Sequence, residues 1–245
     1  METVKRRKVF RDVVRGYSST ILEEDFVYVK HLTPHDQVEL EEIEEKYYNI
    51  ALRKGVPTEE EMLLFLKEEE QWSDADDKFI EDKKYFLETL KTAKTKMVIK
   101  RQIDEQEKTI KKETLALAQK EAEKMALLGN TCEKYAKDRL NDFYMIKSFY
   151  KDKDLSVPLF DEDKFDELKN QDIKKVVFRY NELFEGFSEE NIQYTILEDF
   201  YNPYLSFSED SMQFYGKPFC ELTYNQIRLI VYTRVFKNIF DTNEN

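Results

Sequence analysis

The sequence predicts a mainly α-helical protein with a long central helix, an aromatic-rich C-terminal helical domain and a small β element at the N-terminus. Residues 74–128 contain neither glycine nor proline, and these two residue types occupy only ten positions of the 245. Charged residues make up 37% of the chain, a proportion typical of long helices joined by short loops. From Phe143 onward lie 22 of the 33 Phe and Tyr residues, which indicates a compact C-terminal domain.

Residues 1–32 have the weakest helical pattern, and we expect them to form an N-terminal arm with either a small β-hairpin or an added edge strand. Short clusters of β-branched and aromatic residues occur at positions 9–14 and 26–29, with Gly16 between them. Such clusters separated by turn residues are typical of short strands. Six basic residues precede Gly16, so the arm is also cationic.

A charge-rich helical arm is predicted over residues 33–130, and its first two helices have clear N-terminal signals. Thr33 precedes Pro34, a pair typical of an N-cap followed by the first helical position. Thr58 and Glu61 have the spacing of a capping box, in which each side chain bonds the backbone N–H of the other residue.

The longest predicted element is a single helix over residues 74–128. Ser73 supplies its N-cap, with Asp76 three residues later, and Gly129 permits the left-handed turn that ends many helices. An unbroken helix of this length would reach ~80 Å at ~1.5 Å per residue, so part of it should extend beyond its own domain. Its first half carries a stripe that we expect to be buried: Phe79, Phe86, Leu90, Ala93 and Met97.

The middle of this helix is the first candidate partner-binding surface. Its apolar residues form a narrow seam among charged neighbours: Ile99, Ile103, Ile110 and Leu117. The last three are spaced by seven, as in a heptad repeat. We expect the seam to bind a partner helix or a second copy of this chain; the alternative is a strut whose charges are simply solvated. A hairpin is not predicted, because the run KRQIDEQ at residues 100–106 contains only one usual turn former, Asp104.

Residues 131–245 are predicted to form a compact helical domain with its last helix in the middle of the core. That helix, capped by Thr223, is apolar on two sides, so Tyr232 and Phe236 are expected to be buried. A second candidate partner surface lies in the aromatic loops before it: Tyr201, Tyr204 and Phe207. Aromatic side chains are frequent anchors of protein–protein contacts.

No residue pattern indicates enzymatic chemistry. The two histidines, His31 and His35, lie on either side of a helix start, so they would not share a face as zinc ligands. Cys132 and Cys220 lie far apart, without the spacing of a disulfide framework or a metal site. We therefore predict no catalytic, cofactor-binding or metal-binding residues, and a protein that is not an enzyme. No apolar run has the length of a membrane span or signal peptide, which predicts a soluble, cytoplasmic protein with no membrane partner.

Charge is distributed unevenly along the chain, and this offers an alternative function. Residues 59–82 contain eleven acidic and two basic side chains, whereas residues 83–112 contain ten basic and four acidic ones. A nucleic-acid-associated protein would use the basic segment together with Arg6, Arg7 and Lys8. The preferred interpretation is that the lysines pair with acidic residues on neighbouring turns or on a helix packed alongside. Nucleic acid is disfavoured as a partner because the segment lacks interleaved aromatic residues and the net charge is −12.

Three passages carry a resemblance to a known group of proteins. They are VYVKHLTPHDQVELEEIEEKYY, then GVPTEEEMLLFLKEEEQWSDADD with the long Lys/Glu helix behind it, and finally FYGKPFCELTYNQIRLIVYTRVFKNIF. In the order of these elements, and in the GKP and LT of the last passage, residues 26–240 resemble tail-assembly proteins of contractile-tailed, T-even-like bacteriophages. That group includes baseplate hub subunits and tail assembly chaperones.

This resemblance implies a non-enzymatic role in virion assembly, through contacts with other phage tail or baseplate proteins. It also implies a location in the host cytoplasm during assembly, or in the tail of the virion. A lasting structural protein of the baseplate and a transient tail assembly chaperone both remain open, and the resemblance carries over no catalytic residues.

Overall fold

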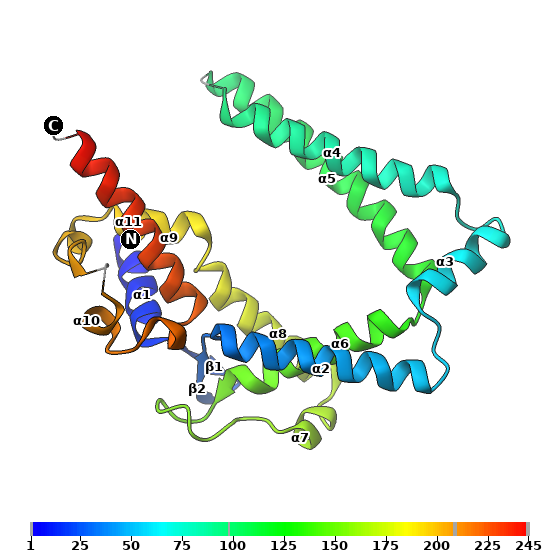
Figure 1. The fold of residues 1–245 in the computed structure, drawn as a ribbon, viewed down its shortest axis with the longest axis horizontal. Coiled ribbons are helices and arrows are strands. Elements are labelled where there is room, and N and C mark those ends of the chain that lie inside the picture. The colour runs from blue at the N-terminus through cyan, green and yellow to red at the C-terminus, as the bar shows by residue number, and fades with distance from the viewer. Residues whose placement is uncertain (1, 98, 208–209, 244–245) are drawn as a thin grey trace. The chain divides into compact units, whose positions relative to one another are not determined.

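The computed structural model describes residues 2–97, 99–207 and 210–243, and it is mainly helical with one small sheet (Figure 1). The sheet has three antiparallel strands in the order β1-β2-β3, of which the first two lie near the N-terminus. The predicted mainly α fold class with a small N-terminal β element is confirmed.

Helices make up most of the element order. The elements are α1 (Glu2–Arg15), β1 (Tyr17–Leu22), β2 (Asp25–Lys30), α2 (Pro34–Arg53), α3 (Glu59–Glu68), α4 (Asp74–Thr95), α5 (Lys100–Leu128), α6 (Cys132–Ser148), β3 (Phe149–Tyr150), α7 (Glu162–Asp166), α8 (Asn170–Glu185), α9 (Glu189–Ile196), the 3₁₀ helix η1 (Asp199–Tyr204), α10 (Ser211–Tyr215), the 3₁₀ helix η3 (Phe219–Glu221) and α11 (Tyr224–Asn243).

The chain divides into two compact units. Unit 1 comprises Met1–Glu44 and Asp138–Asn245, and unit 2 comprises Glu45–Lys137. Both boundaries fall within helices, α2 and α6. This division differs from the predicted one at residues 32 and 130. The N-terminal arm is not separate, because α1 packs against α9 and α11 in unit 1.

The N-terminal arm begins with a helix, α1, although short strands are predicted there. Its apolar side chains Val9, Phe10 and Val13 have helical spacing and share a core with residues of α9, η1 and α11. β-branched residues favour strands. Packing of an apolar side against distant parts of the chain provides most helical stability in proteins, however, and it outweighs that local preference here.

The sheet follows directly after a turn at Gly16. This residue has a φ of 74°, a conformation that glycine adopts without strain. β1 and β2 then pair as a hairpin, with Tyr17 opposite Lys30 and Leu22 opposite Asp25. The second strand includes the predicted cluster at positions 26–29, whereas the first lies after the predicted cluster at positions 9–14. The buried residues of this second core come from the sheet and from α6, α7 and α8: Val27, Val29, Met145, Phe149, Phe165 and Val176.

The last helix, α11, starts as predicted but covers the first core with one side only. Thr223 and Gln226 exchange two hydrogen bonds at its start, of 2.9 and 3.3 Å. Leu229 is buried in the first core. Tyr232 and Phe236, expected to be buried, are only half-buried and pack against its margin. The helix therefore lies on the core and not in the middle of it.

The other predicted helix starts are confirmed. The capping boxes at Thr58 and Ser73 are both formed. Before α2, Asp36 accepts hydrogen bonds from the backbone and hydroxyl of Thr33, each of 2.8 Å, and the helix begins at Pro34. These side chains satisfy N–H groups that the first turn of a helix leaves unpaired.

The prediction of one helix over residues 74–128 is wrong. The structure shows two helices, α4 and α5, packed against each other as a helical hairpin (Figure 1). α4 ends at Thr95, and Ile99 is extended immediately before α5 begins. A long isolated helix with one apolar row gains little stability in water. Reversal of the chain allows α4 and α5 to cover each other's row of apolar side chains.

His31 occupies an apolar position in unit 1. Its ring lies edge-on to Phe184 and Phe187, and its Nε2 is 2.9 Å from Ser18 Oγ. The buried Nδ1 has no hydrogen-bond partner among the residues that the structure describes. Burial disfavours the charged imidazolium and lowers the pKa of His31 to about 3.

The free energy of unfolding should therefore decrease as the pH falls below about 6.5, the ordinary pKa of histidine. Below that pH the unfolded chain binds a proton at His31, whereas the folded protein excludes this proton until the pH approaches 3. At about 1.4 kcal/mol per pH unit, the loss between pH 6.5 and 5 should be about 2 kcal/mol. His31→Gln should remove this part of the slope. Urea melts of the unaltered protein and the variant at pH 7, 6 and 5 measure the free energy of unfolding. The same dependence on pH in both proteins would contradict a neutral buried His31.

Candidate interaction surfaces of the helical hairpin

The two helices of the hairpin meet along a seam with heptad spacing. On each helix, positions shielded from solvent recur at alternating steps of three and four residues. These seam positions are Ile80, Lys83, Leu87, Leu90 and Lys94 on α4, and Ile103, Gln106, Ile110, Glu113, Leu117, Lys120, Lys124 and Leu127 on α5. This spacing is that of a coiled coil. α4 and α5 therefore form an antiparallel coiled coil within one chain.

Polar residues of the seam have partners across the interface. Lys83 forms an ion pair with Glu113, and Gln106 Nε2 donates to the carbonyl of Leu90 at 3.2 Å. Charged and polar groups that lose water are tolerated when they are paired in this way. Apolar residues such as Leu87, which is 5% exposed, supply the buried area. Together the two kinds of contact fix which residues of the two helices lie opposite each other.

Trp72, the only tryptophan of the chain, closes the base of the hairpin. It is 3% exposed and packs with Leu66 of α3, Ile80 of α4 and Leu128 of α5. The base of the hairpin is therefore a small core to which three helices contribute.

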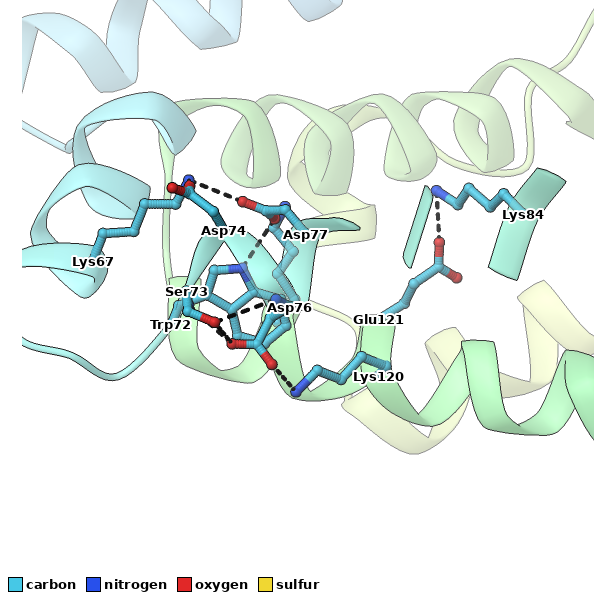
Figure 2. Close-up of polar contacts among 10 residues, drawn as sticks. Lys67, Trp72, Ser73, Asp74, Asp76, Asp77, Lys84, Lys120 and Glu121 are labelled. Atoms are coloured by element: carbon cyan, nitrogen blue, oxygen red, sulfur yellow. Dashed lines mark hydrogen bonds and ion pairs between the residues drawn. The ribbon is translucent and has the colours of Figure 1, made fainter. Parts of the chain in front are cut away.

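Charged residues surround Trp72 (Figure 2). The indole Nε1 donates to Asp77 at 2.9 Å, and Asp77 also pairs with Lys124 at 2.7 Å. Lys120 pairs with Asp76 at 2.7 Å, and its Nζ lies 4.6 Å from the centre of the indole ring. Cations at this distance over an aromatic face are attracted by its negative potential. These contacts join the first turn of α4 to the last turns of α5.

The same contacts favour the charged form of both carboxylates. The hydrogen bond from Lys120 is the largest of the effects that lower the pKa of Asp76, to about 2. Burial raises the pKa of Asp77, but hydrogen bonds from Lys124 and the indole outweigh it and lower this pKa to about 2 as well. The network therefore stays ionised throughout the neutral and mildly acidic range.

The two long edges of the hairpin differ in chemistry. Positions directly after the seam residues form a polar edge, where Lys84 pairs with Glu121 at 2.8 Å (Figure 2). Positions directly before the seam residues carry Phe79 and Phe86, one heptad apart and 41% and 43% exposed. On α5 the corresponding position is Ala116. We call Phe79, Phe86 and Ala116 the aromatic edge.

The structure corrects the interpretation of the predicted partner seam. Ile103, Ile110 and Leu117 do lie in one row, but all three are half-buried in the contact with α4. The partner helix that their spacing requires is therefore supplied by the same chain. Ile99 differs, because it precedes α5 and is 58% exposed.

The second predicted surface is also corrected in part. Tyr201 is fully buried, and its hydroxyl lies 2.7 Å from Thr233 Oγ1, so it is not accessible to a partner. Tyr204 packs on Phe10, with 4.9 Å between ring centres, and remains 37% exposed. Phe207 is 42% exposed. Only the last two rings reach the surface.

Many of the basic residues considered for nucleic-acid binding contact other parts of the chain. Arg6 pairs with Glu198, and the guanidinium of Arg7 lies 5.3 Å from the ring centre of Phe200. Lys8 is exposed. Three lysines of the basic segment pair with glutamates of α5: Lys83, Lys84 and Lys94. The uneven charge along the sequence thus matches pairing between two helices packed side by side.

The residues considered for metal binding do not come together. His31 is buried, whereas His35 is exposed and lies 3.4 Å from Glu39. In the described part of the chain, no three His, Cys, Asp or Glu side chains form a group that could hold a metal ion. None of the described helices combines the length and the apolar character that a membrane span requires.

The fold and these contacts define the class of the chain: a helical protein with an intramolecular coiled-coil hairpin. Compared with models of protein families, with curated proteins and with solved structures, the chain matches none of them. Its function is therefore inferred from its own residues and their geometry.

The exposure of the aromatic edge contradicts the burial predicted from the sequence. Phe79 and Phe86 are expected in a buried stripe, yet both face solvent in part. The sequence contains two parallel heptad rows, because Ile80 and Leu87 follow these phenylalanines by one residue. Which of the two rows is buried depends on the side of α4 against which α5 packs. The prediction of a single long helix could not specify that side.

Replacement of leucine by alanine should affect the free energy of unfolding differently at a seam position and at a solvent-exposed position. Leu87→Ala leaves a cavity between α4 and α5 and should lower the free energy of unfolding of unit 2 by about 2–4 kcal/mol. Leu115→Ala, on a side chain that is 61% exposed, should change it by less than about 0.5 kcal/mol. Trp72 fluorescence in urea melts measures both effects, since Trp72 lies in unit 2. Equal effects would mean that the helices do not pair through this seam.

Proposed function

We propose that this protein is a non-enzymatic assembly protein that acts through protein–protein contacts, with the helical hairpin as its main binding element. The observation that supports the proposal is the aromatic edge. Phe79 and Phe86 present two large rings to solvent on a hairpin whose opposite edge is occupied by ion pairs. Exposed aromatic residues grouped on a regular element are typical of surfaces that bind other proteins.

A partner helix fits this edge for a geometric reason. The seam uses one side of each helix, and the aromatic edge borders it along the groove between α4 and α5. A helix in that groove would contact both phenylalanines, and the small side chain of Ala116 leaves room for the larger ones of the partner. Covering the exposed part of each Phe contributes about 1 kcal/mol. The product is a three-stranded coiled coil, a common form of helix recognition.

The more specific role comes from the resemblance to tail-assembly proteins of contractile-tailed bacteriophages. On that basis we propose a baseplate or tail hub component, or a tail assembly chaperone, with other tail proteins as partners. The place of action would be the host cytoplasm during assembly, or the virion tail. Both roles need a binding element of the kind that the hairpin offers.

Co-expression with the products of the neighbouring genes tests the proposal. The tagged protein should retain a partner through two affinity steps, whereas Phe79→Ser/Phe86→Ser should lose it, because serine removes the apolar contact. Tyr85→Ser is the matched control, since Tyr85 lies on α4 outside the seam and is 75% exposed. Circular dichroism and Trp72 fluorescence check that each variant is folded.

If the double phenylalanine variant retains the same partner as the Tyr85 variant, the aromatic edge is not the interface. Mass spectrometry of purified phage particles then separates the two phage roles. A lasting component is present in the particles at a fixed stoichiometry, whereas a chaperone is found only in the infected-cell fraction. Absence from both would contradict the phage assignment.

A further inference from the structure

The end of the hairpin at which the chain passes from α4 to α5 is strongly basic. Residues 91–112 contain eight basic and three acidic side chains, a net charge of +5, and we call this segment the basic tip. Lys94 pairs with Glu107 at 2.6 Å, and Arg101 pairs with Glu105 at 3.1 Å. Among the residues that the structure describes, the other six cations of the tip have no ion-pair partner: Lys91, Lys96, Lys100, Lys108, Lys111 and Lys112. Like charges three or four residues apart on a helix repel each other, so a bound acidic surface would stabilise the tip.

A hollow opens in the polar edge within the basic tip. It has a volume of about 450 Å³, and side chains of both helices line it: Lys91, Lys94, Thr95, Glu107, Ile110 and Lys111. Lysine side chains carry apolar stems below their charged ends. The hollow can therefore receive an apolar side chain while carboxylates around that side chain meet the lysines.

α3 presents a surface with the complementary chemistry. Residues 59–70 contain six glutamates and one lysine, a net charge of −5. Leu64 and Phe65 are 57% and 53% exposed. Four exposed glutamates lie three or four residues from one or both of them, and are therefore their neighbours on the helix surface: Glu60, Glu61, Glu68 and Glu69. We call Leu64, Phe65 and these glutamates the acidic face.

The basic tip and the acidic face of one chain lie at opposite ends of the hairpin (Figure 1). α3 lies at the base, where Leu66 shares a core with Leu128 at the end of α5. The tip contains the start of α5, and the 29 residues of this helix span about 43 Å at ~1.5 Å per residue. The tip therefore cannot reach the acidic face of its own hairpin.

An acidic protein surface suits the tip better than a nucleic acid does. The tip contains one arginine and no aromatic residue, so it lacks the side chains on which bases stack. A nucleic acid would also leave Phe65 in solvent. The acidic face supplies both carboxylates for the lysines and an apolar side chain for the hollow.

We propose that a second copy of the chain binds the basic tip through its acidic face, with Phe65 of each copy in the hollow of the other. Two hairpins packed side by side in opposite directions place each tip beside the other copy's α3. Both contacts then form at once, as in a closed two-fold dimer. The two surfaces belong to unit 2 and share no residue with the aromatic edge, so that edge stays open to a different protein.

Sedimentation velocity of the full chain over a range of concentrations tests the proposal. The unaltered chain should form a dimer, and added salt should weaken the dimer because it screens exposed charges. Phe65→Ser should weaken self-association at least ten-fold. Phe178→Ser in unit 1, at a ring that is 64% exposed, is the matched control and should dimerise as the unaltered chain does. A chain that stays monomeric, or a dimer that Phe65→Ser leaves unchanged, would overturn the proposal.

Reversal of charge on each surface identifies the contact. Lys91→Glu/Lys111→Glu should be monomeric, since acidic tips would face acidic faces. Glu60→Lys/Glu68→Lys should be monomeric for the converse reason. An equimolar mixture of the two variants should dimerise, because every tip then meets a face of opposite charge. Circular dichroism checks that each variant is folded. A mixture that stays monomeric would overturn the proposal.

Two further measurements separate this interface from other uses of the hairpin. Phe79→Ser/Phe86→Ser should leave the dimer unchanged, so failure of one proposal does not decide the other. A dimer that this variant converts to a monomer would mean that the copies meet at the aromatic edge, which overturns the proposal. So would binding of a labelled oligonucleotide that Lys91→Glu/Lys111→Glu abolishes, because the tip would then be a nucleic-acid site.

Discussion

A helix in water gains most of its stability when its apolar side is covered, and the arrangement of this chain depends on how each helix meets that requirement. α4 and α5 cover each other along a heptad seam, which is why a stretch without glycine or proline turns back on itself. α1 meets the requirement against α9 and α11. Phe79 and Phe86 remain partly exposed at the aromatic edge, where we propose that a partner helix binds.

Local features of the fold could be predicted from the sequence because their causes are local. A capping box joins residues three apart, so those at Thr58 and Ser73 are readable from residue type alone. The reversal between α4 and α5 has no such signal. Contacts such as Lys83 with Glu113 stabilise it, and these residues are close only after the chain has turned. The contacts that stabilise the reversal of the chain therefore cannot be recognised from any short segment of the sequence.

The candidate site shows the same limit. The spacing of Ile103, Ile110 and Leu117 correctly indicates a coiled-coil seam, but spacing shows only that a helix is needed and not which helix supplies it. Here the supplier is α4 of the same chain. Tyr201 is a second case, because it is buried in a core with Val13 of α1 and Leu229 of α11, and its hydroxyl lies beside that of Thr233. Exposure of an aromatic residue near a loop is decided by such distant contacts.

The two stretches of chain that form unit 1 are synthesised at different times, because unit 2 lies between them in the sequence. Val13 of α1 shares a core with Leu229 of α11, so during synthesis α1 waits for about 200 further residues, roughly 10–40 s at ~5–20 residues per second. Unit 2 is continuous in sequence and can fold during this interval. The apolar side of α1 is therefore open to aggregation or capture in the nascent chain. Substitutions in α1 should accordingly reduce the yield of soluble protein more than they weaken the finished fold.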